Sequence, residues 1–85
     1  MKWQHSVRSQ EDYASAPAKI QRAFDKQVRL LAANLLYPSL HAKKYDESLN
    51  LWQARVNRDW RFYFTIRRDT YQIVRIVPHE PGVSS

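Results

Sequence analysis

The segment 51–79 constrains the fold more than any other part of the sequence, because it contains three strand-like runs with little between them. The runs 51–56, 60–66 and 71–77 are rich in aromatic and β-branched residues, which favour strands. Short polar links separate the runs. The segment therefore predicts an antiparallel three-stranded meander.

Alternation along these strands divides the predicted sheet into an apolar face and a polar face. Side chains of successive residues in a strand point to opposite faces. The apolar face is predicted to carry Trp52, Ala54, Val56, Trp60, Phe62, Phe64 and Ile66. The polar face is predicted to carry Gln53, Arg55, Arg61, Tyr63 and Thr65. One face is thus core and the other is charged.

The short link 57–59 brings two arginines together. If Val56 pairs with Trp60, Arg55 lies directly opposite Arg61. Like charges at opposed positions destabilise a sheet, whereas an anion bound between two guanidinium groups would be favoured. The spacing alone is compatible with two interpretations of this pair: an anion-binding site, or two side chains that extend into solvent.

The register of the third strand depends on the link that precedes it. A three-residue loop at 68–70 predicts three cross-strand pairs: Ile76 with Phe62, Val74 with Phe64, and Arg75 with Tyr63. A slip by one residue would reverse the faces. The first register is preferred, because it keeps the apolar residues together and gathers one polar cluster: Arg55, Arg61, Tyr63 and Arg75.

The segment 17–36 predicts a helix that covers the sheet. Its apolar residues recur at helical spacing: Ile20, Phe24, Val28, Leu31 and Leu35. The helix is expected to end near Tyr37, since Pro38 disfavours helical geometry in the residue before it. Its opposite side carries a basic stripe, which is either a solvated face or a phosphate contact: Lys19, Arg22, Lys26 and Arg29.

Three further segments complete the prediction. Residues 1–8 form either an edge strand or an arm that wraps the domain. Ser9 and the acidic residues after it predict the start of a short helix through about Ala14. Residues 40–45 predict a short strand, followed by a turn at 46–50. In this strand His41, Lys43 and Lys44 are either surface charge or side chains that reach a ligand on the polar face.

Composition limits the classes of protein. The 85 residues, 44% hydrophobic, predict a single small domain spanning residues 1–85, and the absence of cysteine excludes disulfides and thiolate metal sites. No apolar run is long enough for a signal peptide or a membrane span, so a cytoplasmic protein is expected. The net charge of +6 favours a polyanionic partner, either a nucleic acid or an acidic protein. The histidines and carboxylates lack ligand spacing, so neither metal nor cofactor is expected.

Three motifs carry a family resemblance. The predicted helix is followed by P-S-L-x-x-K-K, then by L-W-x-x-R-V-x-R-D-W-R-F-Y-F, and the last strand ends in I-V-x-H. This order resembles the RelE/ParE toxin superfamily of bacterial toxin–antitoxin systems. The resemblance implies an α+β fold, with helices packed on one face of a small twisted antiparallel sheet. It also implies an acidic antitoxin partner, and either cleavage of mRNA on the ribosome or inhibition of DNA gyrase.

The resemblance also implies roles for individual residues. Arg55 and Arg61 match the family's phosphate-binding arginines, and His79 falls where many members have a histidine. The predicted catalytic residues are therefore Arg55, Arg61 and His79, with substrate-binding residues Lys43, Lys44, Tyr63 and Arg75. Unlike many RNA-cleaving members, this sequence has no tyrosine after His79.

Metal-independent RNA cleavage needs a base, an acid and cations around the phosphorane. The arginines can supply the cations, and an imidazole with an ordinary pKa of about 6.5 can move a proton. The sequence thus predicts an mRNA endoribonuclease without membrane or small-molecule cofactor. The alternative is a non-catalytic protein of the same fold, either a gyrase inhibitor or an inactive remnant that binds nucleic acid or protein.

Overall fold

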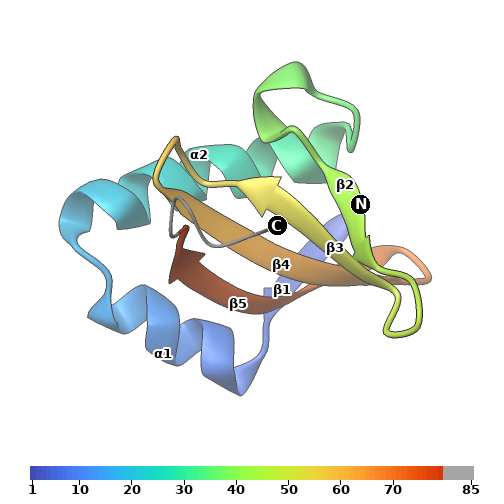
Figure 1. Cartoon of the computed structure of the whole chain (residues 1–85), viewed down its shortest axis with the longest axis horizontal. Coiled ribbons are helices and arrows are strands. Elements are labelled where there is room, and N and C mark those ends of the chain that lie inside the picture. The colour runs from blue at the N-terminus through green and yellow to red at the C-terminus, as the bar shows by residue number, and fades with distance from the viewer. Residues whose placement is uncertain (80–85) are drawn as a thin grey trace.

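The three strand-like runs form neighbouring strands of one five-stranded sheet (Figure 1). The computed structural model describes residues 1–79. The elements in chain order are β1 (Lys2–His5), α1 (Val7–Ser15), α2 (Ala18–Ala33), the 3-10 turn η1 (Pro38–Leu40), β2 (Lys43–Asp46), β3 (Leu51–Arg55), β4 (Trp60–Arg67) and β5 (Thr70–Pro78). The strand order is β1-β5-β4-β3-β2. The predicted α+β class and the meander are confirmed.

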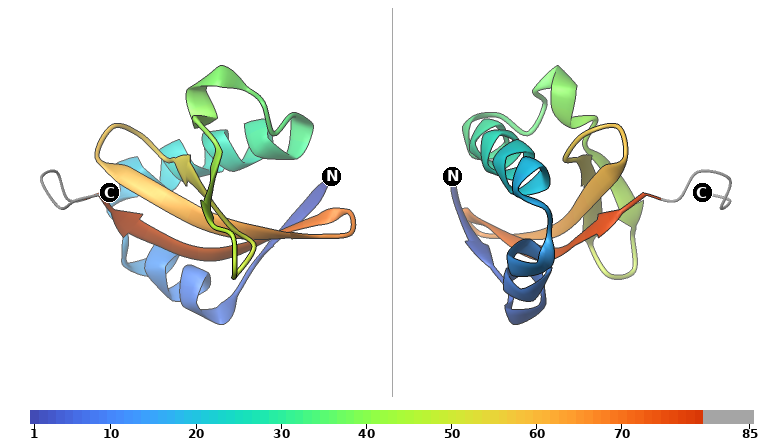
Figure 2. Two further views of the ribbon diagram at one scale, coloured as in Figure 1. Left: turned by 45° about the vertical axis from the view of Figure 1, so that its right-hand side comes forward. Right: turned by 90° about the vertical axis from the view of Figure 1, so that its left-hand side faces the viewer.

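The amino-terminal segment, left open by its sequence, begins with a strand. β1 pairs with β5 in the parallel direction, with Lys2 beside Thr70 and His5 beside Ile73. The sheet is therefore mixed, with one parallel pair at its edge. In the left-hand view of Figure 2, α1 lies along β5 and α2 lies behind β4.

The core lies between α2 and the apolar face of the sheet. The predicted helical stripe is confirmed, because Ile20, Phe24, Val28 and Leu31 are buried, and Leu35 packs partly buried against them. Phe24 meets Phe62 edge-to-face, with ring centroids 5.3 Å apart. The four stripe residues on the other side, Lys19, Arg22, Lys26 and Arg29, are exposed. Among residues 1–79, no helix is both long and apolar enough to cross a membrane.

The predicted register of β3 and β4 is confirmed. Arg55 pairs with Arg61, and the amide of Val56 donates to the carbonyl of Trp60 at 3.0 Å. The short loop leaves no freedom for a slip, because moving one strand by one residue would turn Phe62 out of the core.

The β4–β5 register is partly as predicted. Two pairs are confirmed, Ile76 with Phe62 and Arg75 with Tyr63, whereas the pairing of Val74 with Phe64 is wrong. Phe64 pairs with Ile73 because the turn has two residues rather than three, and a β-bulge at Val74 absorbs the difference. The bulge lets Tyr71, Ile73 and Ile76 all face the core.

The boundaries of the helices and of β2 differ from the predictions. α1 is capped by Ser6, whose hydroxyl accepts from the amide of Ser9 at 3.1 Å, so the predicted start at Ser9 is wrong. α2 ends at Ala33, because the Asn34 side chain accepts from the amide of Leu36 and turns the chain. η1 occupies the start of the predicted strand 40–45, so β2 begins only at Lys43.

Candidate functional site

The polar face of the sheet carries two cross-strand rows of polar side chains. The longer row runs from Lys43 on β2 through Gln53 and Tyr63 to Arg75 on β5. The shorter row is the opposed pair Arg55 and Arg61. Paired residues project from the same face of a sheet, so both rows share one surface.

A cavity of about 670 Å³ opens over β2, β3 and the end of β5. It is lined by His41, Ala42, Lys43, Lys44, Tyr45, Gln53, Ala54, Arg55, Arg61 and His79. The fold thus brings together five of the seven predicted site residues. Tyr63 does not line the cavity but pairs with Gln53, which does. Arg75 lies outside the cavity.

Arg61 is a buried cation at this cavity, with 9% of its surface exposed. Its Nη1 donates to three main-chain carbonyls, those of Asn57 and Arg58 in the β3–β4 loop and of Trp60 at the start of β4, at 2.8, 3.1 and 3.0 Å. Within residues 1–79 no carboxylate forms an ion pair with it. The Nε and Nη2 atoms of Arg61 make no hydrogen bond with the other residues of the segment 1–79, and neither atom is fully buried.

The electrostatics around Arg61 favour an added anion. Burial, followed by the charge of Arg55, lowers the pKa of Arg61, against smaller opposing effects of Tyr63 and Asp59. A guanidinium nevertheless stays protonated near neutral pH. The result is a positive charge whose desolvation is not balanced by an ion pair with any carboxylate among residues 1–79.

Arg55 is held through its main chain rather than its side chain. The buried Gln27 of α2 donates from Nε2 to the carbonyl of Arg55 at 2.9 Å. The Arg55 guanidinium makes no hydrogen bond or ion pair with the other described residues, 1–79. Sequence reasoning missed Gln27, although a polar residue between Phe24 and Leu31 on the buried stripe was a usable signal.

Strand parity separates the two lysines that the sequence treated as interchangeable. Lys43 pairs with Gln53 on the polar face, whereas Lys44 pairs with Trp52 on the apolar side. The Lys44 ammonium lies 5.2 Å from the Trp52 ring centroid, and it donates to Asn50 Oδ1 at 3.0 Å. Lys44 borders the cavity, but its charge is already engaged elsewhere.

Two imidazoles border the cavity from separate elements. The amide of His79 donates to the carbonyl of Asp59 at 2.7 Å, which extends the β4–β5 ladder by one residue and fixes His79 at the rim. His41 follows η1 in the left-handed region, with φ of 46°, which turns the chain into β2. The sequence placed His41 among the side chains that could reach a ligand on the polar face, but not among the predicted catalytic or substrate-binding residues.

Tyr63 is anchored by its neighbours. Its hydroxyl accepts a hydrogen bond from Gln53 Nε2 at 2.9 Å, and the ring of Tyr45 meets its ring edge-to-face at 5.0 Å. Sequence reasoning missed Tyr45, although alternation along β2 puts it on the same side as Lys43.

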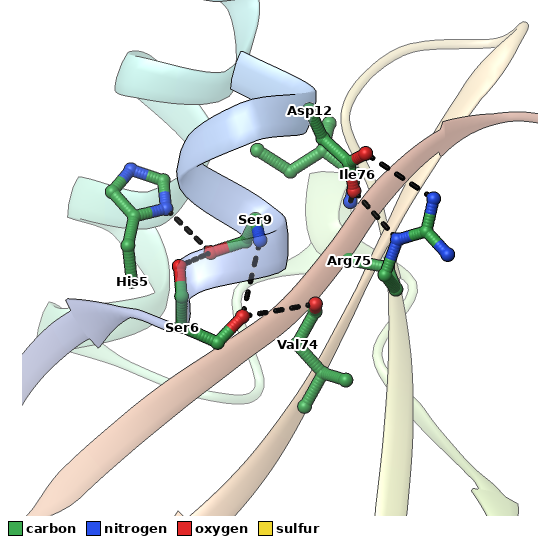
Figure 3. Close-up of polar contacts among 7 residues, drawn as sticks. All are labelled: His5, Ser6, Ser9, Asp12, Val74, Arg75 and Ile76. Carbon is green, nitrogen blue, oxygen red and sulfur yellow. Dashed lines mark hydrogen bonds and ion pairs between the residues drawn. The ribbon is translucent and has the colours of Figure 1, made fainter. Parts of the chain in front are cut away.

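Arg75 does not line the cavity and is paired with α1 instead (Figure 3). Asp12 of α1 accepts from Arg75 Nε and Nη2 at 2.7 and 3.2 Å, and from the amide of Ile76 at 2.9 Å. Burial of Asp12 opposes its ionisation, but the bonds from Arg75 and Ile76 outweigh this effect and lower the pKa of Asp12. Arg75 thus anchors α1 where β5 extends past β1, and its substrate-binding role stays a prediction.

No family model matches the chain and no curated protein matches it, whereas solved structures do. A YoeB/ParE toxin from Agrobacterium tumefaciens matches with a TM-score of 0.78 and 14% identity, over 94% of this chain and 100% of that one. RelE in the archaeal RelE–RelB complex from Pyrococcus horikoshii matches with a TM-score of 0.78 and 15% identity, over 95% and 97%. The YoeB–YefM complex from Staphylococcus aureus matches with a TM-score of 0.75 and 18% identity, over 94% and 98%.

The chain has the fold of the RelE and YoeB toxins. The resemblance found in the sequence is confirmed at the level of the fold. On this RelE/YoeB fold, the cavity combines two arginines, two lysines and two imidazoles, and Lys43 forms no ion pair within residues 1–79. Such a set can bind a phosphodiester and move protons to and from its oxygens. Within residues 1–79, no three His, Asp or Glu side chains lie close enough together to hold a metal ion.

Proposed function

We propose that the protein is the toxin of a toxin–antitoxin pair in the RelE/ParE superfamily, and that it cleaves mRNA on the ribosome without a metal. The observation that supports this proposal most is the opposed pair Arg55 and Arg61, which both line the cavity. Two like charges at opposed positions destabilise a sheet when no anion is bound between them. A phosphate between them turns that repulsion into two charge-assisted contacts.

In this proposal the arginines hold the scissile phosphate and stabilise the phosphorane. A base removes the proton of the 2′-hydroxyl, and the 2′-oxygen forms a bond to phosphorus. The bond from phosphorus to the 5′-oxygen breaks, and an acid protonates that oxygen. The products are a 2′,3′-cyclic phosphate and a 5′-hydroxyl.

His79 is our candidate for one of the two proton transfers, because its rim position borders the same cavity as the arginines. His41 and Lys43 are the candidates for the other. Lys43 is preferred over Lys44, whose ammonium already contacts Asn50 and the Trp52 ring. A lysine would need its pKa lowered by nearby cations to act as a base.

An acidic antitoxin is the proposed partner. The matching S. aureus YoeB and P. horikoshii RelE were solved in complexes with YefM and RelB. The net charge of this chain, +6, and its basic cavity favour an acidic segment that folds onto the polar face. Co-expression of such a partner should relieve toxicity.

The second candidate is a toxin that binds without catalysis, such as a gyrase inhibitor. The sequence after His79 lacks the tyrosine that many RNA-cleaving members of the superfamily carry. A binding toxin would need the basic face but no proton transfer.

Pulse labelling after induced expression in a bacterial host tests the proposal. Incorporation of labelled amino acids should fall before incorporation of labelled thymidine, since translation is the proposed target. Arg55→Gln should abolish the effect. Arg22→Gln, which removes an exposed arginine of α2, should retain it. An earlier fall in thymidine incorporation would favour the gyrase candidate, and no effect on either label would contradict a toxin.

A further inference from the structure

Tyr45 is a large side chain left in solvent at the edge of the cavity. It is 56% exposed and lines the cavity together with Arg55 and Arg61. The register of β2 and β3 shifts between Lys44 and Asp46, so Tyr45 is the extra residue of a β-bulge. Bulges re-aim side chains, and they are frequent beside functional sites. The exposed position of Tyr45 beside the cavity therefore indicates that its ring contacts a ligand.

The ring of Tyr45 rests against a fixed support. Tyr63 lies 5.0 Å away at an interplanar angle of 72°, and its hydroxyl is held by the buried Gln53. In an edge-to-face pair, Tyr63 can cover at most one face of the Tyr45 ring. The other face stays available for a planar group, and the support limits the entropy lost when that group binds.

The surroundings of this ring fit single-stranded RNA. Proteins bind such strands by combining cations along the backbone with aromatic rings on which unpaired bases stack. Here Arg55 and Arg61 supply the cations, and Lys43 lies on the same face as Tyr45. From the register, Tyr45 lies between the positions opposite Trp52 and Leu51, so its main chain is three to four residues along the sheet from Arg55, roughly 10–13 Å at about 3.3 Å per residue.

We propose that Tyr45 is a stacking platform for one nucleobase of single-stranded RNA, next to the phosphate site of the arginine pair. The inference rests on the proposed function and deepens it. Tyr63, which was predicted from the sequence to bind substrate, is instead the support of the platform. The stacked base belongs to a neighbour of the nucleotide whose phosphate lies at Arg55, so Tyr45 contributes to the choice of cleavage position.

Binding of a non-cleavable RNA tests the platform directly. The probe is a short fluorescent oligoribonucleotide that is 2′-O-methylated throughout, with one abasic residue moved stepwise along it. For the parent protein, one abasic position should weaken binding by roughly 5- to 150-fold, the measured worth of base–aromatic stacking. Tyr45→Leu should show the same loss with intact RNA and no further loss at that abasic position. Tyr45→Phe should bind like the parent.

Two variants make the outcomes distinguishable at one fixed salt concentration. Tyr37→Leu, the same substitution at a tyrosine outside the cavity, should bind like the parent. Arg55→Gln should weaken binding of every probe. If Tyr45→Leu keeps the parent's affinity, or keeps the full abasic penalty, the platform is refuted while the proposed function stands. If Arg55→Gln binds every probe as tightly as the parent, the proposed function fails, and the platform fails with it.

Discussion

Gln27 on α2 donates a hydrogen bond from its side-chain amide to the main-chain carbonyl of Arg55 on β3, at 2.9 Å. The same nitrogen donates to the carbonyl of Ser39 at 3.1 Å, and the Ser39 hydroxyl donates back to Gln27 Oε1 at 3.3 Å. Ser39 lies in the turn that leads to His41 and β2. The buried side chain of Gln27, which is only 6% exposed, therefore fixes β3 and the turn before His41 relative to each other.

Gln27→Leu should weaken both the fold and the site. The substitution keeps a similar volume but leaves buried carbonyls without donors, which costs about 1–3 kcal/mol in the free energy of unfolding. RNA affinity should fall as well, because Arg55 loses its anchor. Gln21→Leu is the matched control, since Gln21 donates to the carbonyl of Tyr13 at 2.7 Å, away from the cavity. Urea unfolding and RNA binding should separate the two variants. Equal RNA affinity in both would contradict a positioning role for Gln27.

Arg55 and Arg61 should respond differently to removal of their charge. Arg55→Gln should leave the melting temperature unchanged or raise it, because the substitution relieves a like-charge pair. Arg61→Gln should lower stability by about 1–3 kcal/mol, because Nη1 donates to three carbonyls in the β3–β4 loop and at the start of β4. Differential scanning calorimetry measures both. A marked fall for Arg55→Gln would mean that Arg55 is structural, and its functional assignment would be lost.

His5 should make stability depend on pH. Burial lowers the pKa of His5, against a smaller raising effect of Asp25. The unfolded chain therefore binds a proton more readily than the folded protein. As a result, the free energy of unfolding decreases as the pH falls below about 6.5. His5 stacks on Phe24 and shares a hydrogen bond with Ser9, which fixes the ring there.

Urea unfolding at a series of pH values measures this dependence. His5→Gln should remove the part of the decrease that begins near pH 6.5, whereas the exposed His41→Gln should retain it. An unchanged pH profile in His5→Gln would show that another group carries the dependence.

The two catalytic roles predict different losses. Arginine holds a phosphate but does not shuttle protons near neutral pH, whereas imidazole does both. His79→Gln should therefore spare RNA affinity and lower the cleavage rate by about 10² to 10⁴, the usual worth of general acid–base catalysis. Single-turnover cleavage and binding of the 2′-O-methylated probe measure the two effects. If His79→Gln cleaves at the parent's rate, the proton transfer belongs to another group, with His41 and Lys43 the next to be substituted.

Local patterns were enough to predict the parts of the fold governed by short-range constraints. The helical spacing of Ile20, Phe24, Val28 and Leu31 identified the buried face of α2. The three-residue link 57–59 allowed one register that kept Phe62 in the core, and this register placed Arg55 opposite Arg61. Both inferences depend on residues close together in the sequence, where periodicity and loop length leave few alternatives.

The failures involve contacts between distant segments. The bulge at Val74 satisfies a two-residue turn and the core at once, and α1 bonds to the strand there through Ser6 and Asp12 (Figure 3). No local sequence pattern indicated that Arg75 would bind Asp12, which lies 63 positions away in the chain. The split between Lys43 and Lys44 likewise depends on the exact start of β2, which a short strand does not define in sequence.

The central claim, that the arginine pair acts on an mRNA phosphate, is tested most directly by mapping mRNA ends after adding purified protein to translating ribosomes. The parent and Arg22→Gln should both generate new 5′-hydroxyl ends within the ribosome-bound message. Arg55→Gln should generate none above background while keeping the parent's melting temperature. Cleavage by Arg55→Gln at the parent's rate, or no cleavage by the parent itself, would contradict the account.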